Sequence, residues 1–106
     1  MSANLSDLGR FSEPALHILI SLAGGPKHGY AMMLDIGELT GTRPGAGTLY
    51  GALARLEARG WITALPKDER RRPYALTAEG LAVLEARLTE LQALTRSGRQ
   101  RLEATL

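Results

Sequence analysis

Residues 44–50 read Pro44-Gly45-Ala46-Gly47-Thr48-Leu49-Tyr50 and separate two segments whose apolar residues recur at helical spacing. Before this stretch, from about residue 28 to 40, the apolar positions are Tyr30, Met33, Leu34, Ile36 and Leu39. After it, from about residue 46 to 59, they are Leu49, Ala52, Leu53 and Leu56. Gly41 and Gly60 follow the two segments, as glycine commonly does at helix ends. Two helices joined by the short turn 42–45 predict a helix-turn-helix.

The flanking segments extend this pattern on both sides. An earlier helix is predicted from Ser12, whose hydroxyl is expected to cap it, to the stop at residues 24–26. Residues 1–11 show no clear period and are expected to be an arm or a loose first turn. Residues 61–65 and 73–76 are rich in aromatic and β-branched residues and predict two strands around a charged turn. Three helices followed by such a hairpin form a winged helix-turn-helix.

A final long helix is predicted from Ala78, capped by Thr77. It carries leucines in an a/d-like rhythm at Leu81, Leu84, Leu88, Leu91 and Leu94. Because an apolar helix that extends beyond a small core needs a partner surface, we expect these leucines to form a homodimer interface. The predicted fold is mostly α with a small β-hairpin. Its parts are an N-terminal arm (1–11), a winged helix-turn-helix domain (12–77) and a dimerisation helix (78–106).

Composition narrows the function classes. The chain has 106 residues, which fit one domain, and it lacks cysteine. Its histidines, His17 and His28, have no cysteine nearby, so neither a metal site nor another cofactor is expected. No Ser/His/Asp set, carboxylate pair or phosphate-binding glycine loop with lysine occurs, which argues against an enzyme. The longest apolar stretch, 15–23, is too short to span a bilayer, and a cytoplasmic protein is expected.

The helix after the turn offers a surface for double-stranded DNA. On a helical wheel its outward face contains Gly47, Gly51, Ala54 and Ala58, with Thr48, Tyr50 and Arg55 on its edges. Small residues would let the helix backbone lie deep in a major groove, while the flanking side chains reach phosphates or base edges. Sparse base contacts would leave specificity to phosphate positioning and DNA shape. A merely exposed helix is the alternative interpretation of this face.

Basic residues near this helix are the other DNA-binding candidates. The formal net charge is only +2, so the position of each charge matters more than the sum. The hairpin turn carries three consecutive arginines, which suit phosphate contacts or a narrow minor groove. An ordinary solvated turn is the alternative. The start of the second helix suits a phosphate as well. The candidates are Arg70, Arg71 and Arg72 in the turn, Lys27, His28 and Tyr30 at that helix start, and Arg43 in the tight turn.

Two aromatic residues keep alternative interpretations. Tyr30 contacts DNA in one interpretation and belongs to the core in the other. Trp61, directly after Gly60, is expected to anchor the hairpin to the helices, and the alternative places it in a pocket for a small-molecule effector. At the level of the whole chain, the alternative to DNA binding is a winged helix that serves only protein interaction. The arginine-rich turn favours DNA.

Four motifs in order resemble the PadR family of transcriptional regulators, over roughly residues 12 to 85. They are His28-Gly29-Tyr30, the run Pro44 to Tyr50, the set Leu53, Arg55-Leu56-Glu57 and Gly60, and the set Arg70-Arg71-Arg72, Tyr74, Leu76-Thr77 and Gly80. The single last helix resembles the short subfamily, in which that helix forms the dimer. The resemblance implies a homodimeric repressor of a palindromic operator, released by a small molecule or another signal. Residues 78–106 lack the aromatic that stacks on drug-like ligands in some members, so such a pocket is not expected.

Overall fold

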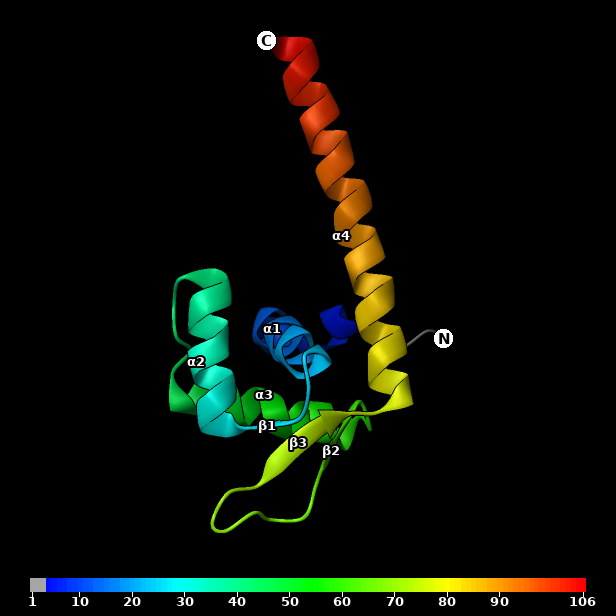
Figure 1. Cartoon of the computed structure of the whole chain (residues 1–106). Helices are drawn as coiled ribbons and strands as arrows, with labels where there is room; N and C mark the ends of the chain where they lie inside the picture. The colour runs from blue at the N-terminus through cyan, green and yellow to red at the C-terminus, as the bar shows by residue number, and fades with distance from the viewer. Residues whose placement is uncertain (1–3) are drawn as a thin grey trace.

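The computed structural model describes residues 4–106, which form a mostly helical domain with a small sheet and one protruding helix (Figure 1). In chain order the elements are η1 (Leu5–Phe11), α1 (Ser12–Ala23), β1 (Lys27–His28), α2 (Gly29–Thr40), α3 (Ala46–Ala58), β2 (Ile62–Ala64), β3 (Pro73–Leu76) and α4 (Ala78–Thr105). This order confirms the winged helix-turn-helix followed by a long helix. No helix among residues 4–106 is long and apolar enough to cross a membrane.

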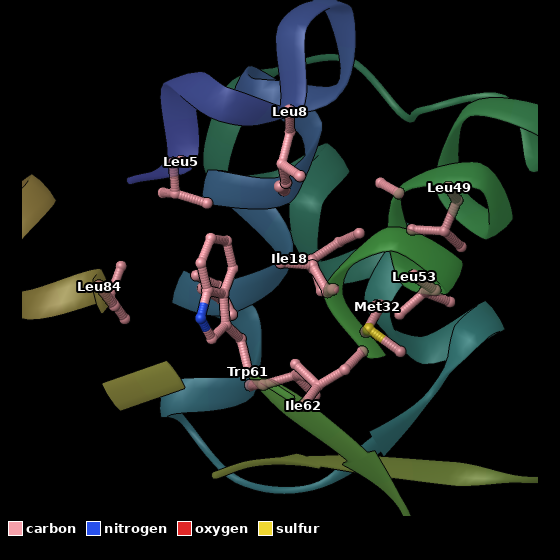
Figure 2. Close-up of a cluster of buried hydrophobic side chains, with 14 of the residues drawn as sticks. Leu5, Leu8, Ile18, Met32, Leu49, Leu53, Trp61, Ile62 and Leu84 are labelled. Carbon is pink, nitrogen blue, oxygen red and sulfur yellow. The ribbon is translucent and has the colours of Figure 1, made fainter. Parts of the chain in front are cut away.

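Helix α1 lies at the centre of the domain and contacts η1, α2, α3, α4 and β3. Its residues Ala15, Ile18 and Leu19 are completely buried, because an apolar stripe at helical spacing faces neighbours on several sides. The core around them is built from α2, α3, α4 and the wing, as Figure 2 shows for Met32, Leu49, Leu53, Ile62 and Leu84. Helices α2 and α3 are thereby held by the same buried stripe.

The segment before α1 differs from the prediction. Residues 5–11 are a 3₁₀ segment, broken at Gly9 (φ +57°, ψ −125°), that packs on α1 and α3, and Leu5 and Leu8 are buried in the core (Figure 2). With three residues per turn, Leu5 and Leu8 fall on one face, which explains why no α-helical period was visible. The expectation of an arm is wrong for this part, and residues 1–3 lie outside the described residues. Ser12 does not cap α1 either, because its hydroxyl donates to the carbonyl of Gly9 at 2.7 Å.

The sheet contains the predicted hairpin and one additional strand. It is antiparallel in the order β1-β3-β2, with Ile62 opposite Leu76 and Lys27 opposite Tyr74. We call the segment from Ile62 to Leu76 the wing. At its tip, the amides of Asp68 and Arg71 donate to each other's carbonyls at 2.9 and 3.0 Å, around a left-handed Glu69 with φ +58°. The third strand, β1, holds the start of α2 beside the wing.

The end of α3, the wing and the start of α4 meet at one junction. Gly60 turns the chain with φ +74°, and the indole of Trp61, 2% exposed, lies in the core near Leu84 and Ile18 (Figure 2). Thr77 caps α4 as predicted, accepting from the amide of Gly80 at 3.0 Å, and its hydroxyl donates to the carbonyl of Gly60 at 2.6 Å. Trp61 therefore anchors the wing to the helices, and its indole is not available to line an open effector pocket.

At Gly80, α4 packs directly on the backbone of Trp61, which precedes the wing. A Cβ added there would overlap the carbonyl oxygen of Trp61 and would lie 2.8 Å from its carbonyl carbon. Gly98, in the same helix, has open space around it.

We expect Gly80→Ala to lower the free energy of unfolding by about 1–3 kcal/mol, because the methyl group displaces backbone. Gly98→Ala is the matched control and should raise it by up to about 1 kcal/mol, because alanine favours helix. Urea unfolding at one fixed protein concentration measures both. Equal stabilisation by the two substitutions would contradict the close contact.

Candidate nucleic-acid interface

Helix α3 presents part of the smooth outward face that the sequence predicts. Thr48 and Ala54 are exposed, Tyr50 is 53% exposed, and a Cβ at Gly47 would meet no atom within 4 Å. The buried side of α3 consists of Leu49, Ala52, Leu53 and Leu56, as expected. A duplex could therefore approach the first turns of α3 closely around Gly47.

Gly51 does not belong to this open face. A Cβ there would lie 2.8 Å from the ring of Phe11, so a side chain of η1 covers the glycine. Arg55 stacks on the same ring, with its guanidinium carbon 3.8 Å from the ring centroid, and donates to the carbonyl of Gly51 at 2.9 Å. The guanidinium of Arg10 also faces this ring at 5.0 Å. Gly51 is thus a packing position, and Arg55 is held at the edge of α3.

Arg10 and Phe11 were missing from the predicted interface, although they line a hollow with Gly47 and Thr48. The spacing of Leu5 and Leu8 was the signal for a 3₁₀ turn at this place, and Phe11 follows the break in the helix at Gly9. The N-terminal segment therefore extends the edge of α3 with one more cation.

A cleft lies between the start of α2, α3 and the wing, and we call it the wing cleft. It has a volume of about 290 Å³ and is lined by His28, Gly29, Tyr30, Tyr50, Arg70, Arg71, Arg72 and Tyr74. Tyr30 is 58% exposed, which excludes its placement in the core. A Cβ at Gly29 would lie 2.6 Å from the hydroxyl of Tyr50, so the glycine gives the tyrosine room. Most of the predicted contacts from α2, α3 and the wing thus meet in one place.

Lys27 does not join this group. Its ammonium donates to the carbonyl of Ser21, contacts the carbonyl of Gly25 at 3.3 Å and lies 4.0 Å from a carboxylate oxygen of Asp35. The hydroxyl of Ser21 donates to the same carboxylate at 2.6 Å. These bonds join α1, β1 and α2. The ammonium of Lys27 is thus engaged within the chain, and Lys27 is not carried into the interface proposed below.

The three wing arginines have different environments. Arg70 is exposed in the turn itself. Arg71 places its Nη1 3.2 Å from Nε2 of His28, and Arg72 donates to the carbonyl of Leu65 at 2.8 Å, which braces the base of the wing. Arg43 is exposed and its side chain covers Gly37. Arg70 therefore has the most freedom to contact a phosphate.

Tyr74 is the titratable residue with a clear shift in this region. Burial in the sheet raises its pKa above the usual 10.0, and the nearby Glu57 and Tyr50 raise it further, while Arg72 lowers it. Its phenol stays neutral at physiological pH and places no negative charge in the wing cleft.

The leucines predicted for dimerisation divide between two uses. Leu81 and Leu88 are 55% and 43% exposed and line a groove of about 320 Å³ on α4. Leu84 is only 5% exposed and packs in the core of its own chain, so most of its surface cannot meet a partner. Leu91 is half-buried, beside Leu5 and Leu16. Leu94 is 69% exposed but lies about 140° around the helix axis from Leu81, at 3.6 residues per turn.

A cavity of about 360 Å³ lies where α1, α2 and α3 meet. Its lining includes His17, Ile36, Thr40 and Thr48 but does not include Trp61. Among residues 4–106, no three His, Cys, Asp or Glu side chains converge as a metal site would require.

A winged helix with a basic, aromatic cleft between its helix-turn-helix and its wing defines a transcriptional regulator of the winged helix-turn-helix class. Residues 18–86 match the PadR-like family of transcriptional regulators, and the chain belongs to that family. PadR-like proteins regulate transcription and are not enzymes.

Solved structures agree with this assignment. A transcriptional regulator from Clostridium thermocellum has 30% sequence identity and a TM-score of 0.74, over 90% of this chain and 94% of that one. A PadR family transcription regulator from hypervirulent Clostridium difficile has 26% identity and a TM-score of 0.74, over 84% of this chain and 97% of that one.

A relative is also found by sequence. An uncharacterized 37.1 kDa protein in transposon TN4556 of Streptomyces fradiae is 45% identical over 76 residues, which are 72% of this chain and only 22% of that protein.

The pKa of Tyr74 has a consequence for stability at high pH. Because the folded chain holds the phenolic proton more tightly than the unfolded chain, unfolding releases it, and stability falls as the pH rises through about 10. We expect Tyr74→Phe to reduce this alkaline loss. Urea unfolding at neutral pH and at about pH 11 measures the difference in the free energy of unfolding between the two pH values. Tyr30→Phe is the control for removal of one phenol, and an unchanged alkaline slope in Tyr74→Phe would contradict the shift.

Proposed function

We propose that this chain binds double-stranded DNA as a homodimer and represses transcription from a palindromic operator. The observation that carries the proposal is the wing cleft, in which α2, α3 and the wing present tyrosines, a histidine and three arginines together. Arginine and tyrosine hydroxyls are ordinary donors to phosphate oxygens. A winged helix that served only protein interaction would have no need for this concentration of cations. A gel shift with the DNA upstream of the chain's own gene separates the two functions.

Helix α3 is the element proposed to enter the major groove. Its open part, around Gly47 and Thr48, lets backbone approach the base edges, while Tyr50 and Arg55 lie at its sides. Few long polar side chains point outward there, so we infer that specificity depends strongly on phosphate positions and DNA shape. Dense base-specific footprints along α3 would argue against this mode of recognition.

Helix α4 is proposed to form the homodimer. Its 28 residues extend about 42 Å, well beyond the domain (Figure 1). The exposed leucines Leu81, Leu88 and Leu102 lie on one stripe of this helix, at separations of 7 and 14 residues. Burying such a stripe against its two-fold copy follows the coiled-coil pattern. A two-fold dimer would present two α3 helices about one DNA turn, ~34 Å, apart.

Repression follows if the bound dimer covers a promoter in the cytoplasm, where bacterial DNA lies. Release by a small-molecule effector that changes the dimer is the regulation that family membership suggests. Since Trp61 is buried, such a molecule would bind elsewhere, and ligand screening by thermal shift tests whether an effector exists.

Removing the charge of Arg70 tests the wing. We expect Arg70→Gln to weaken binding to any duplex and to flatten the plot of log K against log salt by about 0.9 for each phosphate that the variant no longer neutralises. Arg101→Gln is the matched control, because Arg101 is exposed on the distal half of α4 and lies about 160° around the helix from Leu81. Fluorescence anisotropy between about 50 and 200 mM salt measures the slope. An equal slope for Arg70→Gln and wild type would exclude Arg70 as a phosphate ligand.

A charge on α4 tests the dimer. Leu88→Glu places a carboxylate on the proposed stripe, and we expect the dimer to dissociate at least tenfold more readily, because each ~1.4 kcal/mol of association free energy is a factor of ten. Leu94→Glu makes the same change on another side of the helix and should leave the dimer intact. Analytical ultracentrifugation over a range of concentrations measures both. Dissociation by Leu94→Glu alone would show that the interface uses a different stripe.

A further inference from the structure

His28 makes two contacts that a neutral imidazole cannot satisfy together. Its Nδ1 caps α2 by accepting from the amide of Ala31 at 3.3 Å. Its Nε2 lies 3.2 Å from Nη1 of Arg71 in the wing. Both the amide and the guanidinium are donors, and arginine stays protonated in proteins. A neutral imidazole has one lone pair and one N–H on its ring nitrogens, so it accepts only one of the two bonds.

The neutral tautomer that keeps the helix cap has its proton on Nε2. While Nδ1 accepts from Ala31, the proton of the neutral ring is on Nε2 and points toward the guanidinium of Arg71. Two donors then converge on one position with no acceptor between them. Protonating His28 would remove the cap and add a second positive charge, so it does not resolve the conflict. An anionic oxygen at that position accepts from both donors and lets the cap persist.

We propose that one DNA backbone phosphate binds at this position, held by His28 Nε2–H together with Arg71. We call the position the phosphate site. The inference rests on the proposed DNA-binding function and assigns one contact within it. A phosphate oxygen has several lone pairs and accepts charge-assisted bonds from two donors at once. Because His28 belongs to the start of α2 and Arg71 to the wing, the same phosphate ties these two elements together.

The surroundings of His28 and Arg71 favour an anion. None of the residues that line the wing cleft is acidic, and Arg70 and Arg72 add two further cations. The exposed rings of Tyr30 and Tyr50 line the same cleft and carry hydroxyl donors. Glu57 lies near Tyr74, and Asp68 and Glu69 lie in the turn of the wing, but none of these three carboxylates lines the cleft.

The affinity of protein variants for a mixed-sequence duplex tests the phosphate site, because phosphate contacts do not depend on sequence. His28→Ser keeps an N-cap acceptor but removes the Nε2 donor, and Arg71→Gln removes the other donor. We expect each to weaken binding about tenfold, and the double variant to be weaker by about the same factor and not by a hundredfold, since both serve one oxygen. Arg101→Gln is the charge-matched control. Urea unfolding verifies that each variant is folded.

Nitrogen NMR gives a second readout, the tautomer of His28, in a protein that keeps both His28 and Arg71. His17→Gln leaves one histidine in ¹⁵N-histidine-labelled protein, and its shifts distinguish the two neutral tautomers. We expect the complex with the duplex to contain the Nε2–H tautomer. The Nδ1–H tautomer in the complex, or full additivity of the two affinity losses in the double variant, would exclude the phosphate site while leaving DNA binding intact. If wild-type protein does not bind the duplex at low salt, both the proposed function and the phosphate site are excluded.

Discussion

The contact of Gly80 with the backbone of Trp61 is the constraint on which the arrangement of the molecule depends. Gly60 follows the end of α3 and Trp61 leads into the wing, while Thr77 caps α4 and its hydroxyl donates to the carbonyl of Gly60. Backbone packs on backbone there, with no side chain or linker between to act as a hinge. In the proposed dimer, the pairing of α4 would therefore set the separation of the two α3 helices directly.

The basic residues show how a chain of net charge +2 can still offer a cationic surface. Several of them are used within the protein: Lys27 holds the turn between α1 and β1, and Arg72 braces the wing. These bonds fix the backbone that carries the remaining charges. Arg70 and the pair of Arg71 with His28 then lie on one rigid frame, so that little ordering entropy opposes their proposed contact with phosphate.

The sequence predicted the features that depend on local patterns. Helical spacing identified α2 and α3, and Thr77 and Gly41 marked helix ends that the structure confirms. Long-range features were not accessible. Strand β1 has two residues and exists only through its pairing with β3, more than forty residues away. The a/d rhythm of α4 was correctly found, but the same rhythm serves burial within the chain at Leu84 and exposure at Leu88. Lys27 resembled a free cation although its partners lie within eight residues, because two backbone carbonyls and Asp35 meet its ammonium only once α1, β1 and α2 are packed together.

Gly47 and Gly51 show why a helical wheel alone could not define the interface. They are four residues apart and nearly aligned on α3, yet Gly47 is open and Gly51 is filled by the ring of Phe11. The smooth surface available to a major groove is therefore confined to the first turns of α3 and is shorter than the sequence suggested. A shorter groove-facing surface supplies fewer base contacts. The cations around it, from Arg10 and Arg55 to the wing, must then provide a larger share of the proposed affinity.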